Sequence, residues 1–444
     1  MLLGRPAHAL RRHHLSLLEP AADRGPDGRR RRSFNGLLRF LAEGERHYHI
    51  ALRHFIGRNF DNLPQYLSPE NIFLILFRTK ALLKHYDNVG RYFRDPHLKA
   101  AFSFQNMYLG LSPYDAPATY SLLQYTELAD GVWFPRGGMY RVVESLAAIA
   151  ERRGVRFAYN TPVARIEVDG DRATGVVLED GTRLTANVIV ANADLPYVYR
   201  RLLPDRVEAA ILERLKYTCS AIMFYWGLDT VYPQLGPHNV FLADDYHASF
   251  ERIFTDHLLP TAPSVYVHAP ARIDPTAAPA GRDTLMALVP VGHLDAAAGQ
   301  DWATLQARAR NAVLGRLAAM GVTDLDAHVT CEVSYLPRDW ADLYNMTKGA
   351  AFGLSHNLLQ VGYFRPHNRH HRYRNLYFVG ASTHPGGGLP IVLLSARLTT
   401  ERILQAHGRL YPARHLSPPA IIPRHGIGHR AASPPPAAVA SGHG

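Results

Sequence analysis

The sequence contains little cysteine and no long apolar run. Its 444 residues include only Cys219 and Cys331, which excludes a disulfide framework and a clustered thiolate metal site. This cysteine usage fits a reducing, intracellular compartment. The longest uninterrupted apolar run, residues 72–77, is far shorter than the roughly 20 residues that cross a bilayer. Any membrane contact is therefore expected to be peripheral.

A further absence concerns nucleotide binding. No Gly-x-Gly-x-x-Gly sequence occurs in the chain, although a strand, this glycine turn and a helix open the usual dinucleotide-binding fold. Residues 1–33 contain neither the strand nor the glycines, and the Arg, Pro and His content of this segment predicts a disordered basic leader. The Pro-, Ala- and His-rich residues 411–444 predict a disordered tail.

Positive charge exceeds negative charge. The chain has 49 Lys and Arg against 38 Asp and Glu, a formal net charge of +11, and residues 29–32 are all arginine. Such a run is typical of a solvated arm, and attraction to an anionic membrane surface is the alternative. Nucleic-acid binding is not expected, because no recognition motif with interleaved aromatic residues accompanies the run.

Residues 34–130 are predicted to be mainly helical. Ser68 followed by Pro69 and Glu70 is typical of a helix start, and apolar residues continue from Ile72 to Leu83 with basic residues between them. A basic amphipathic helix can lie in a membrane interface. The alternative is that its apolar face packs on the core.

Strands dominate the chain from residue 155 onward. Alternating residues broken by Asp-Gly turns predict hairpin strands, and the apolar run at 188–191 predicts a strand buried on both faces. A second mixed region follows, and the chain ends with a buried strand, a glycine loop and a helix. The predicted strands are 155–159, 163–168, 174–178, 183–186, 188–191, 264–268, 284–289 and 376–379, and the final helix is 391–408.

The segment 376–392 is the most informative for chemistry. A short apolar strand runs through small residues and glycines into a helix, which exposes backbone N–H groups at a positive helix end. Glycine is needed where a side chain would hold the backbone away from a ligand. A bound anion or polarised ring and a simple tight turn are both compatible with this pattern. The candidate ligand-binding residues are Gly380, Ala381, Ser382, Gly386, Gly388, Pro390, Ile391 and Val392.

This segment resembles the C-terminal flavin-contacting motif of the phytoene desaturase family, and of its fungal members above all. Family members usually carry Pro-Gly-Thr-Gly or Pro-Gly-Ala-Gly, whereas this chain has Gly387 at the third position. Three other stretches resemble the same family in the same order: residues 131–139, which contain Gly137 and Gly138, residues 160–166, which contain Val163, and residues 191–196.

The resemblance implies an α/β fold of the flavin amine oxidase and desaturase type. Its dinucleotide-binding domain would be incomplete, its substrate domain would hold a mixed β-sheet, and its helical region would face a membrane. It implies FAD as the cofactor, with Gly137, Gly138, Val163 and the residues of the glycine loop at its site. The implied parts are a leader (1–33), a helical substrate and membrane region (34–130), a first FAD-binding part (131–194), a substrate domain (195–345), a C-terminal FAD-binding part (346–410) and a tail (411–444).

The implied reaction is the FAD-dependent desaturation of phytoene or a related carotenoid at a membrane lipid surface. It belongs to carotenoid biosynthesis. No catalytic side chain stands out, and the basic residues around His367, His370 and His371 argue against a metal. The expectation is that the natural protein starts earlier or has lost its first part, so that this chain binds FAD weakly or not at all. An inactive paralogue that binds lipid or a protein partner, another flavin amine oxidase-like oxidoreductase, and a homo-oligomer remain open.

Overall fold

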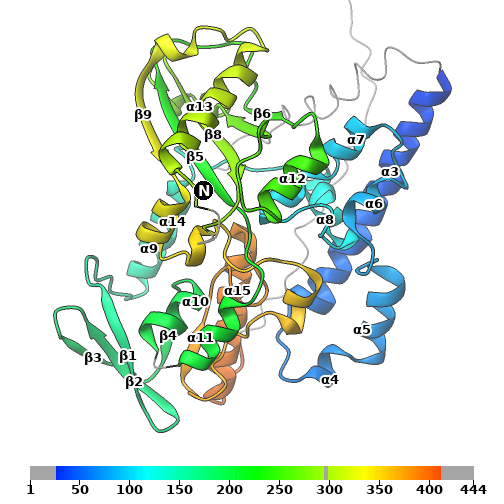
Figure 1. Cartoon of the computed structure of the whole chain (residues 1–444). Helices are drawn as coiled ribbons and strands as arrows, with labels where there is room; N and C mark the ends of the chain where they lie inside the picture. Colours follow the sequence, from blue (N-terminus) through cyan, green and yellow to red (C-terminus); the bar gives the residue numbers. More distant parts are fainter. Residues whose placement is uncertain (1–26, 204, 295–298, 412–444) are drawn as a thin grey trace, which may run out of the picture.

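The computed structural model describes residues 27–203, 205–294 and 299–411. Figure 1 shows three parts: a helical part drawn in blue and cyan, an antiparallel sheet with a covering helix, and a smaller part that holds β1 to β4 and the last helix, α15. Across the described residues, no helix combines the length and the apolar content needed to cross a membrane.

The helical part is built along α3 (Asp27–Ile50), which packs against α8 (Ser121–Tyr125). Its core is aromatic: the rings of Phe93 and Phe102 stack with centroids 4.6 Å apart, and Phe40 packs against both. The other helices are η1 (Ala51–Ile56), α4 (Leu63–Tyr66), α5 (Pro69–Phe73), η2 (Leu74–Arg78), α6 (His85–Val89), α7 (Pro96–Ala101), η3 (Phe104–Leu109), η4 (Ala118–Tyr120) and η5 (Thr126–Asp130).

Two predictions for this part need correction. The leader predicted to be disordered over 1–33 is wrong for residues 27–33, which form the start of α3. Arginine is a good helix former, and the burial of Leu37 and Phe40 stabilises the helix further along. The helix that starts after Ser68 does begin there, but it ends at Arg78 rather than continuing to Leu83.

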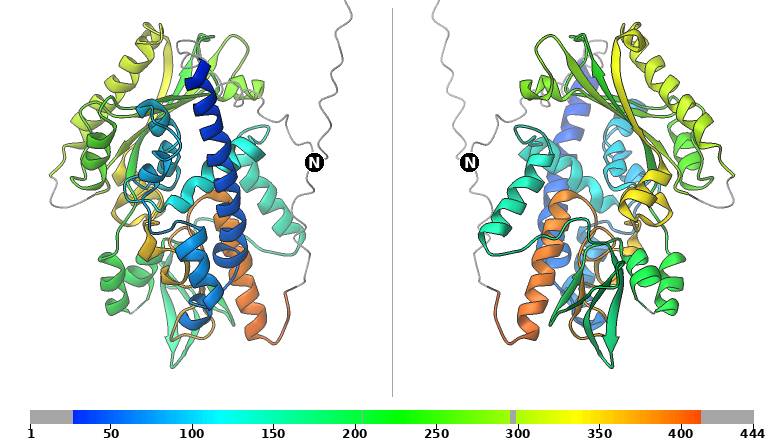
Figure 2. Two further views of the ribbon diagram at one scale, coloured as in Figure 1. Left: turned by 90° about the vertical axis from the view of Figure 1, so that its right-hand side faces the viewer. Right: turned by 90° about the vertical axis from the view of Figure 1, so that its left-hand side faces the viewer.

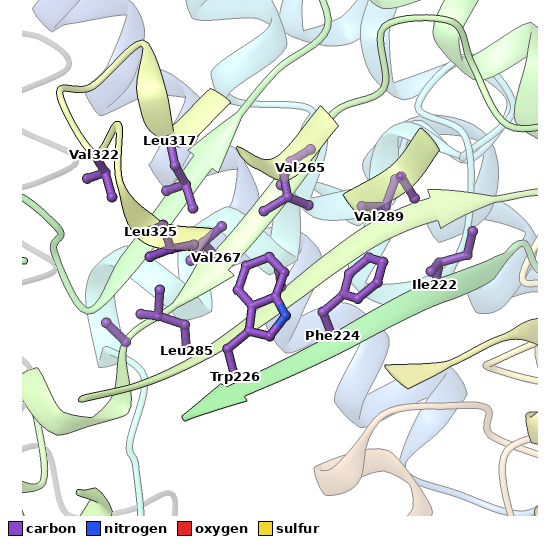
Figure 3. Close-up of a cluster of buried hydrophobic side chains, with 14 of the residues drawn as sticks. Ile222, Phe224, Trp226, Val265, Val267, Leu285, Val289, Leu317, Val322 and Leu325 are labelled. Carbon is purple, nitrogen blue, oxygen red and sulfur yellow. The ribbon is translucent and has the colours of Figure 1, made fainter. Parts of the chain in front are cut away.

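A five-stranded antiparallel sheet forms the second part, with strand order β6-β7-β8-β5-β9. One of its faces packs against α13 (Trp302–Ala318), and the buried cluster between them includes Phe224, Trp226, Val267 and Leu285 (Figure 3). The strands are β5 (Ser220–Leu228), β6 (His238–Phe241), β7 (Val265–His268), β8 (Asp283–Val291) and β9 (Val329–Tyr335). The predicted strands at 264–268 and 284–289 are therefore confirmed as β7 and β8.

The third part contains two small sheets. An antiparallel sheet has the order β1-β2-β3, and β4 pairs in parallel with β10. Five predicted strands are thereby confirmed, and the predicted final helix is α15. The elements are α9 (Tyr140–Arg152), β1 (Val163–Asp169), β2 (Arg172–Leu178), β3 (Arg183–Thr185), β4 (Ile189–Ala191), α10 (Leu195–Tyr197), η6 (Val198–Leu202), α11 (Arg206–Glu213), β10 (Leu376–Phe378) and α15 (Leu389–Ala406).

Two strand predictions in the third part are wrong. Residues 155–159 belong to no strand, although the same residues alternate as a strand would. The strand at 188–191 was expected to be buried on both faces, but Val190 in the middle of β4 is 44% exposed. Its partner β10 is buried throughout.

The remaining short elements lie between strands of the five-stranded sheet or between that sheet and β10. They are α12 (Tyr246–Phe254), η7 (Pro270–Arg272), η8 (Pro275–Ala277), η10 (Leu325–His328), α14 (Pro337–Tyr344), η11 (Thr347–Gly349), η12 (Leu358–Gln360) and η13 (Gly362–Phe364). Figure 2 shows α9 and α15 on the same side of the molecule, with the first turns of α15 directed toward the middle of the structure.

Candidate functional site

The site is centred on residues 380–388, which we call the glycine loop, between β10 and α15. Gly380, Gly386 and Gly388 have φ values of 129°, 144° and 102°, in the region that favours glycine. At Gly386 a Cβ would also lie only 2.8 Å from Nε2 of His356. The backbone conformation therefore requires glycine at these positions, as the sequence pattern predicted.

The end of the loop is open to solvent while its middle is not. Gly386 and Gly387 are buried, whereas Gly388, Leu389 and Pro390 are exposed. Pro390 lies in the first turn of α15, where a missing N–H costs nothing. At the start of the 18-residue helix α15, the N–H groups of Ile391 and Val392 both donate to the carbonyl of Gly388 at 2.9 Å. Pro390 has no N–H, so the N–H of Leu389 is the one in this turn that is presented at the accessible surface.

Asp194 connects the loop to the segment after β4. Ser382 Oγ donates to Asp194 Oδ1 at 2.5 Å, and the backbone N–H of Thr347 donates to Oδ2 at 3.0 Å. Ser382 Oγ in turn accepts the backbone N–H of Leu354 at 3.1 Å. Ser382 was predicted as a cofactor contact, but in the structure it is 2% exposed and has a role in holding the loop.

A buried arginine beneath the loop was not singled out by the sequence. Arg365 is 0% exposed and donates to the carbonyls of Ala381 and Thr383 within the loop. His356, also buried, accepts the backbone N–H of Gly387 through Nε2 at 2.8 Å. The sequence offers no local signal for either role, because burial of an arginine depends on tertiary packing.

Gly137 and Gly138 occupy a second glycine element, before α9. Their φ values are 83° and 93°, and a Cβ at Gly138 would meet nothing within 4 Å. The backbone N–H of Gly137 donates to Oδ2 of Asp274 at 2.5 Å. This N–H lowers the pKa of the Asp274 carboxyl, so the carboxylate and the glycine element stabilise each other.

The remaining predicted residues are placed in different sheets and helices. Val163 is the first residue of β1, opposite Leu178, in a sheet separate from the β4–β10 pair. Ile391 and Val392 are half-buried in the first turn of α15, beside the glycine loop. The structure thus gathers the predicted residues of 380–392 into one site and places Val163 in another sheet.

A histidine cluster lies next to the site. His370 Nδ1 accepts the backbone N–H groups of Arg372 and Tyr373 at 3.0 and 3.1 Å. Among the residues that the structure describes, no three His, Cys, Asp or Glu side chains are grouped to hold a metal ion.

The residues of the glycine loop fit one half of a dinucleotide cofactor. The exposed N–H of Leu389 at the N-terminus of α15 suits a diphosphate oxygen, and the positive-φ glycines allow a ring system to approach the backbone. Gly380, Ala381, Gly388, Ile391 and Val392 are the residues that would hold it. For the adenosine half, the described residues contain no strand that runs into a Gly-x-Gly-x-x-Gly turn.

Comparisons with known proteins agree with this geometry. The family model for flavin containing amine oxidoreductase matches residues 16–404. The chain is 44% identical over 394 residues to a phytoene desaturase of Neurospora crassa, covering 86% of this chain and 65% of that protein. It is 45% identical over 374 residues to a zeta-carotene-forming phytoene desaturase of Myxococcus xanthus, covering 84% and 72%.

A comparison with solved structures finds a related fold. Wild-type putrescine oxidase bound to putrescine superposes with a TM-score of 0.51 at 15% identity, covering 86% of this chain and 76% of that one. This likeness concerns the fold alone. The chain spans about two thirds of the length of the curated relatives quoted above.

Proposed function

The chain belongs to the flavin containing amine oxidoreductase family and, within it, to the phytoene desaturases, and from this premise we propose that it desaturates phytoene or a related carotenoid with FAD. The observation that carries the proposal is an apolar, partly accessible face of the five-stranded sheet. The residues of the glycine loop would hold FAD, which would supply the hydride acceptor for a desaturation in which an allylic carbon loses a hydride and the neighbouring carbon loses a proton. The residues of the chain hold and orient the substrate and exclude water.

The face of the sheet opposite α13, which we call the open face, includes two rows of side chains that cross the strands. Neither row contains an Asp, Glu, Lys or Arg side chain. Directly paired residues of antiparallel strands lie on the same face, so the register defines both rows. One row is Val240, Tyr266, Leu288, Met223 and Tyr335, and the next is His238, His268, Met286, Tyr225 and Val333. Tyr225, Val240 and Val333 are 40%, 41% and 51% exposed.

The open face borders the other parts of the proposed site. Phe134, three residues before Gly137, packs edge-on against His268 with ring centroids 5.5 Å apart. Burial and the Glu127 carboxylate of the helical part raise the pKa of Tyr266. The open face therefore borders the second glycine element at His268, and an apolar polyene bound there would contact side chains of matching polarity.

A peripheral membrane location is part of the proposal. Phytoene is too apolar to be taken up from water, so the enzyme must draw it from a lipid surface. The segment from α4 to residue 84 carries exposed apolar side chains beside the exposed cations Arg78 and Lys84. The exposed apolar residues are Leu63, Leu67, Ile72, Phe73, Leu76, Phe77 and Leu82, from 38% to 70% exposed. This combination suits the interface of an anionic, intracellular membrane.

The test begins with the chain as it stands. Purified protein is mixed with FAD and desalted, and the flavin absorbance that remains with the protein is recorded. Retained flavin that is bleached by phytoene liposomes without oxygen would support the proposal. Flavin that is retained but not bleached by phytoene would contradict the substrate, and colourless protein would contradict catalysis by this chain.

The exposed side chains of α9 favour a second candidate function, a non-catalytic binding role. None of the residues of α9 is buried, and Tyr140, Val143, Leu146 and Ile149 form a helical stripe that is 70%, 54%, 46% and 48% exposed. Such a stripe marks a surface that binds another protein. A colourless protein that associates with itself or with a partner would support a non-catalytic binding role, and size-exclusion chromatography with light scattering would detect the association.

A further inference from the structure

Arg365 uses all of its hydrogen-bonding capacity on the backbone. A guanidinium group has five N–H donors in a planar fork, and here all five donate to carbonyl oxygens. Nε donates to Thr383 at 3.0 Å, Nη1 to Ser355 at 3.0 Å and Gln360 at 2.9 Å, and Nη2 to Leu354 at 3.0 Å and Ala381 at 2.5 Å.

This arrangement is not an ordinary buried ion pair. Within the described part of the chain, no carboxylate forms an ion pair with Arg365. Burial lowers the pKa of Arg365 to about 10, which still leaves the side chain charged at neutral pH. A charged group with no exposed surface cannot touch a ligand, so its function must be exerted through the five carbonyls.

The five carbonyls belong to two stretches of chain that are distant in sequence. Leu354, Ser355 and Gln360 lie just before Arg365, and Ala381 and Thr383 lie in the glycine loop. The loop is rich in glycine, which loses more conformational freedom on ordering than any other residue. Arg365 therefore adds two fixed contacts, at Ala381 and Thr383, to those that Ser382 makes with Asp194 and Leu354.

His356 extends this support to the end of the loop. Its Nε2 accepts the N–H of Gly387 at 2.8 Å, which requires a ring nitrogen without a proton. Burial and the charge of Arg365 hold the pKa of His356 well below its usual value. Tyr120 of the helical part donates to the backbone carbonyl of His356 at 2.9 Å, so the same support also connects to the helical part.

We propose that Arg365 is a positioning residue for the flavin: it fixes Ala381 and Thr383 directly, and Gly387 through His356, so that the glycine loop leading into α15 is preset for the cofactor. The inference rests on the proposed function for its ligand. It concerns only residues of this chain and is tested first without any flavin.

The test compares the protein with Arg365→Lys. Lysine keeps the charge but has three donors at one point, so it cannot reach five carbonyls. We expect hydrogen–deuterium exchange of the Gly387 amide and its neighbours in 381–388 to become about 10- to 100-fold faster, because hydrogen bonds to a charged group are lost. Where FAD is retained, its dissociation constant should rise by a similar factor, of about 10 to 100.

Arg272→Lys is the matched control. Arg272 is also a largely buried arginine that donates to two carbonyls, those of Tyr232 and Leu235. It pairs with Asp283 in the five-stranded sheet, which we call the substrate sheet because its open face is assigned to the substrate. This variant should lower the melting temperature and leave exchange in 381–388 unchanged. Wild-type exchange in Arg365→Lys, or equal acceleration in both variants, would overturn the proposal. Absence of flavin binding by the unmodified protein would count against the proposed function, and the exchange result would still decide the role of Arg365.

Discussion

The backbone N–H of Gly137 and the carboxylate of Asp274 form a hydrogen bond of 2.5 Å between two parts of the molecule. Gly137 lies in the glycine element that precedes α9, and Asp274 lies between β7 and β8 of the substrate sheet. Asp274 also accepts the backbone N–H and the hydroxyl of Thr276, at 3.1 and 2.8 Å. The position of the glycine element is therefore coupled to the sheet whose open face we assign to the substrate.

Asp274→Asn should weaken this coupling. An amide accepts less strongly than a carboxylate, so we expect a loss of about 1–3 kcal/mol in the free energy of unfolding at pH 7. Because the Gly137 N–H lowers the pKa of Asp274 in the folded chain, the stabilisation is present above the unfolded pKa of about 3.9 and is lost as pH falls through the folded value. Urea unfolding of both proteins should show a difference that is constant above pH 5 and shrinks below about pH 4.

The control for this prediction is Asp256→Asn. Its carboxylate pairs with Arg252 on the surface, where both side chains are more than a third exposed, and such pairs contribute about 0–1 kcal/mol. A difference between Asp274→Asn and the unmodified protein that was as large at pH 3 as at pH 7 would contradict the assigned cause.

Gly386→Ala and Gly387→Ala should differ sharply although the residues are neighbours. At position 386 the new Cβ would lie 2.8 Å from His356 Nε2 at a φ of 144°, so clash and strain together should cost about 2–4 kcal/mol. At position 387 the nearest atom would be His356 Cε1 at 3.3 Å, with no unusual φ. This contact is tight, but a small shift can relieve it. Alanine also restricts the unfolded chain more than glycine does, and this stabilises the folded protein by about 0.4–1 kcal/mol, which offsets the cost of the contact.

Thermal melts and flavin titrations of the two variants would check this. Equal destabilisation by both substitutions would show that the loop around His356 is not positioned as described.

Met286→Gln tests the open face of the sheet. Met286 is half-buried on that face, so a polar replacement of similar size should leave the melting temperature within a few degrees, while phytoene binding falls about 10-fold through the cost of burying an amide. Leu285→Ala, one residue away on the core face and 0% exposed, should instead lower stability by about 2–5 kcal/mol. Phytoene-dependent bleaching of the flavin measures the first effect and urea unfolding the second.

Phe77→Glu tests the membrane surface. Phe77 is 70% exposed in the apolar segment, and a carboxylate there should both remove apolar contact and repel anionic lipid. Flotation with liposomes that contain anionic lipid should fall several-fold, whereas Leu359→Glu, at an equally open site with 75% exposure, should have little effect. Failure of the unmodified protein to float with any lipid composition would contradict the proposed membrane location.

The sequence predicted those elements whose signals are local. The strands between 163 and 191 alternate polar and apolar residues and are separated by Asp-Gly turns, and the turn residues define them. The glycine loop was found because its glycines and small residues lie between a short apolar strand and a helix, and the structure adds that three of these glycines have positive φ. Residues 155–159 carry the same alternation but belong to no strand, since a strand exists only with a hydrogen-bonded partner, which local sequence does not specify.

The parts of the site that were missed depend on tertiary contacts. Arg365 stands in the sequence like any surface arginine, and only the fold brings Ala381 and Thr383 to its guanidinium. Asp274 is separated from Gly137 by most of the substrate sheet in sequence. Val190 was expected to be buried because it is apolar. The residues that cover a strand come from other parts of the chain, so the hydrophobicity of Val190 does not by itself predict its exposure.

The parallel pairing of β4 with β10 also brings together two segments that are far apart in the sequence. The two strands enclose the whole substrate sheet between them in sequence, so they can meet only after a very long loop has closed. Contacts of such sequence separation form slowly. The five-stranded sheet also depends on distant pairings, because β5 pairs with both β8 and β9. The cofactor site and the sheet that we assign to the substrate are therefore both built from segments that are far apart in the chain.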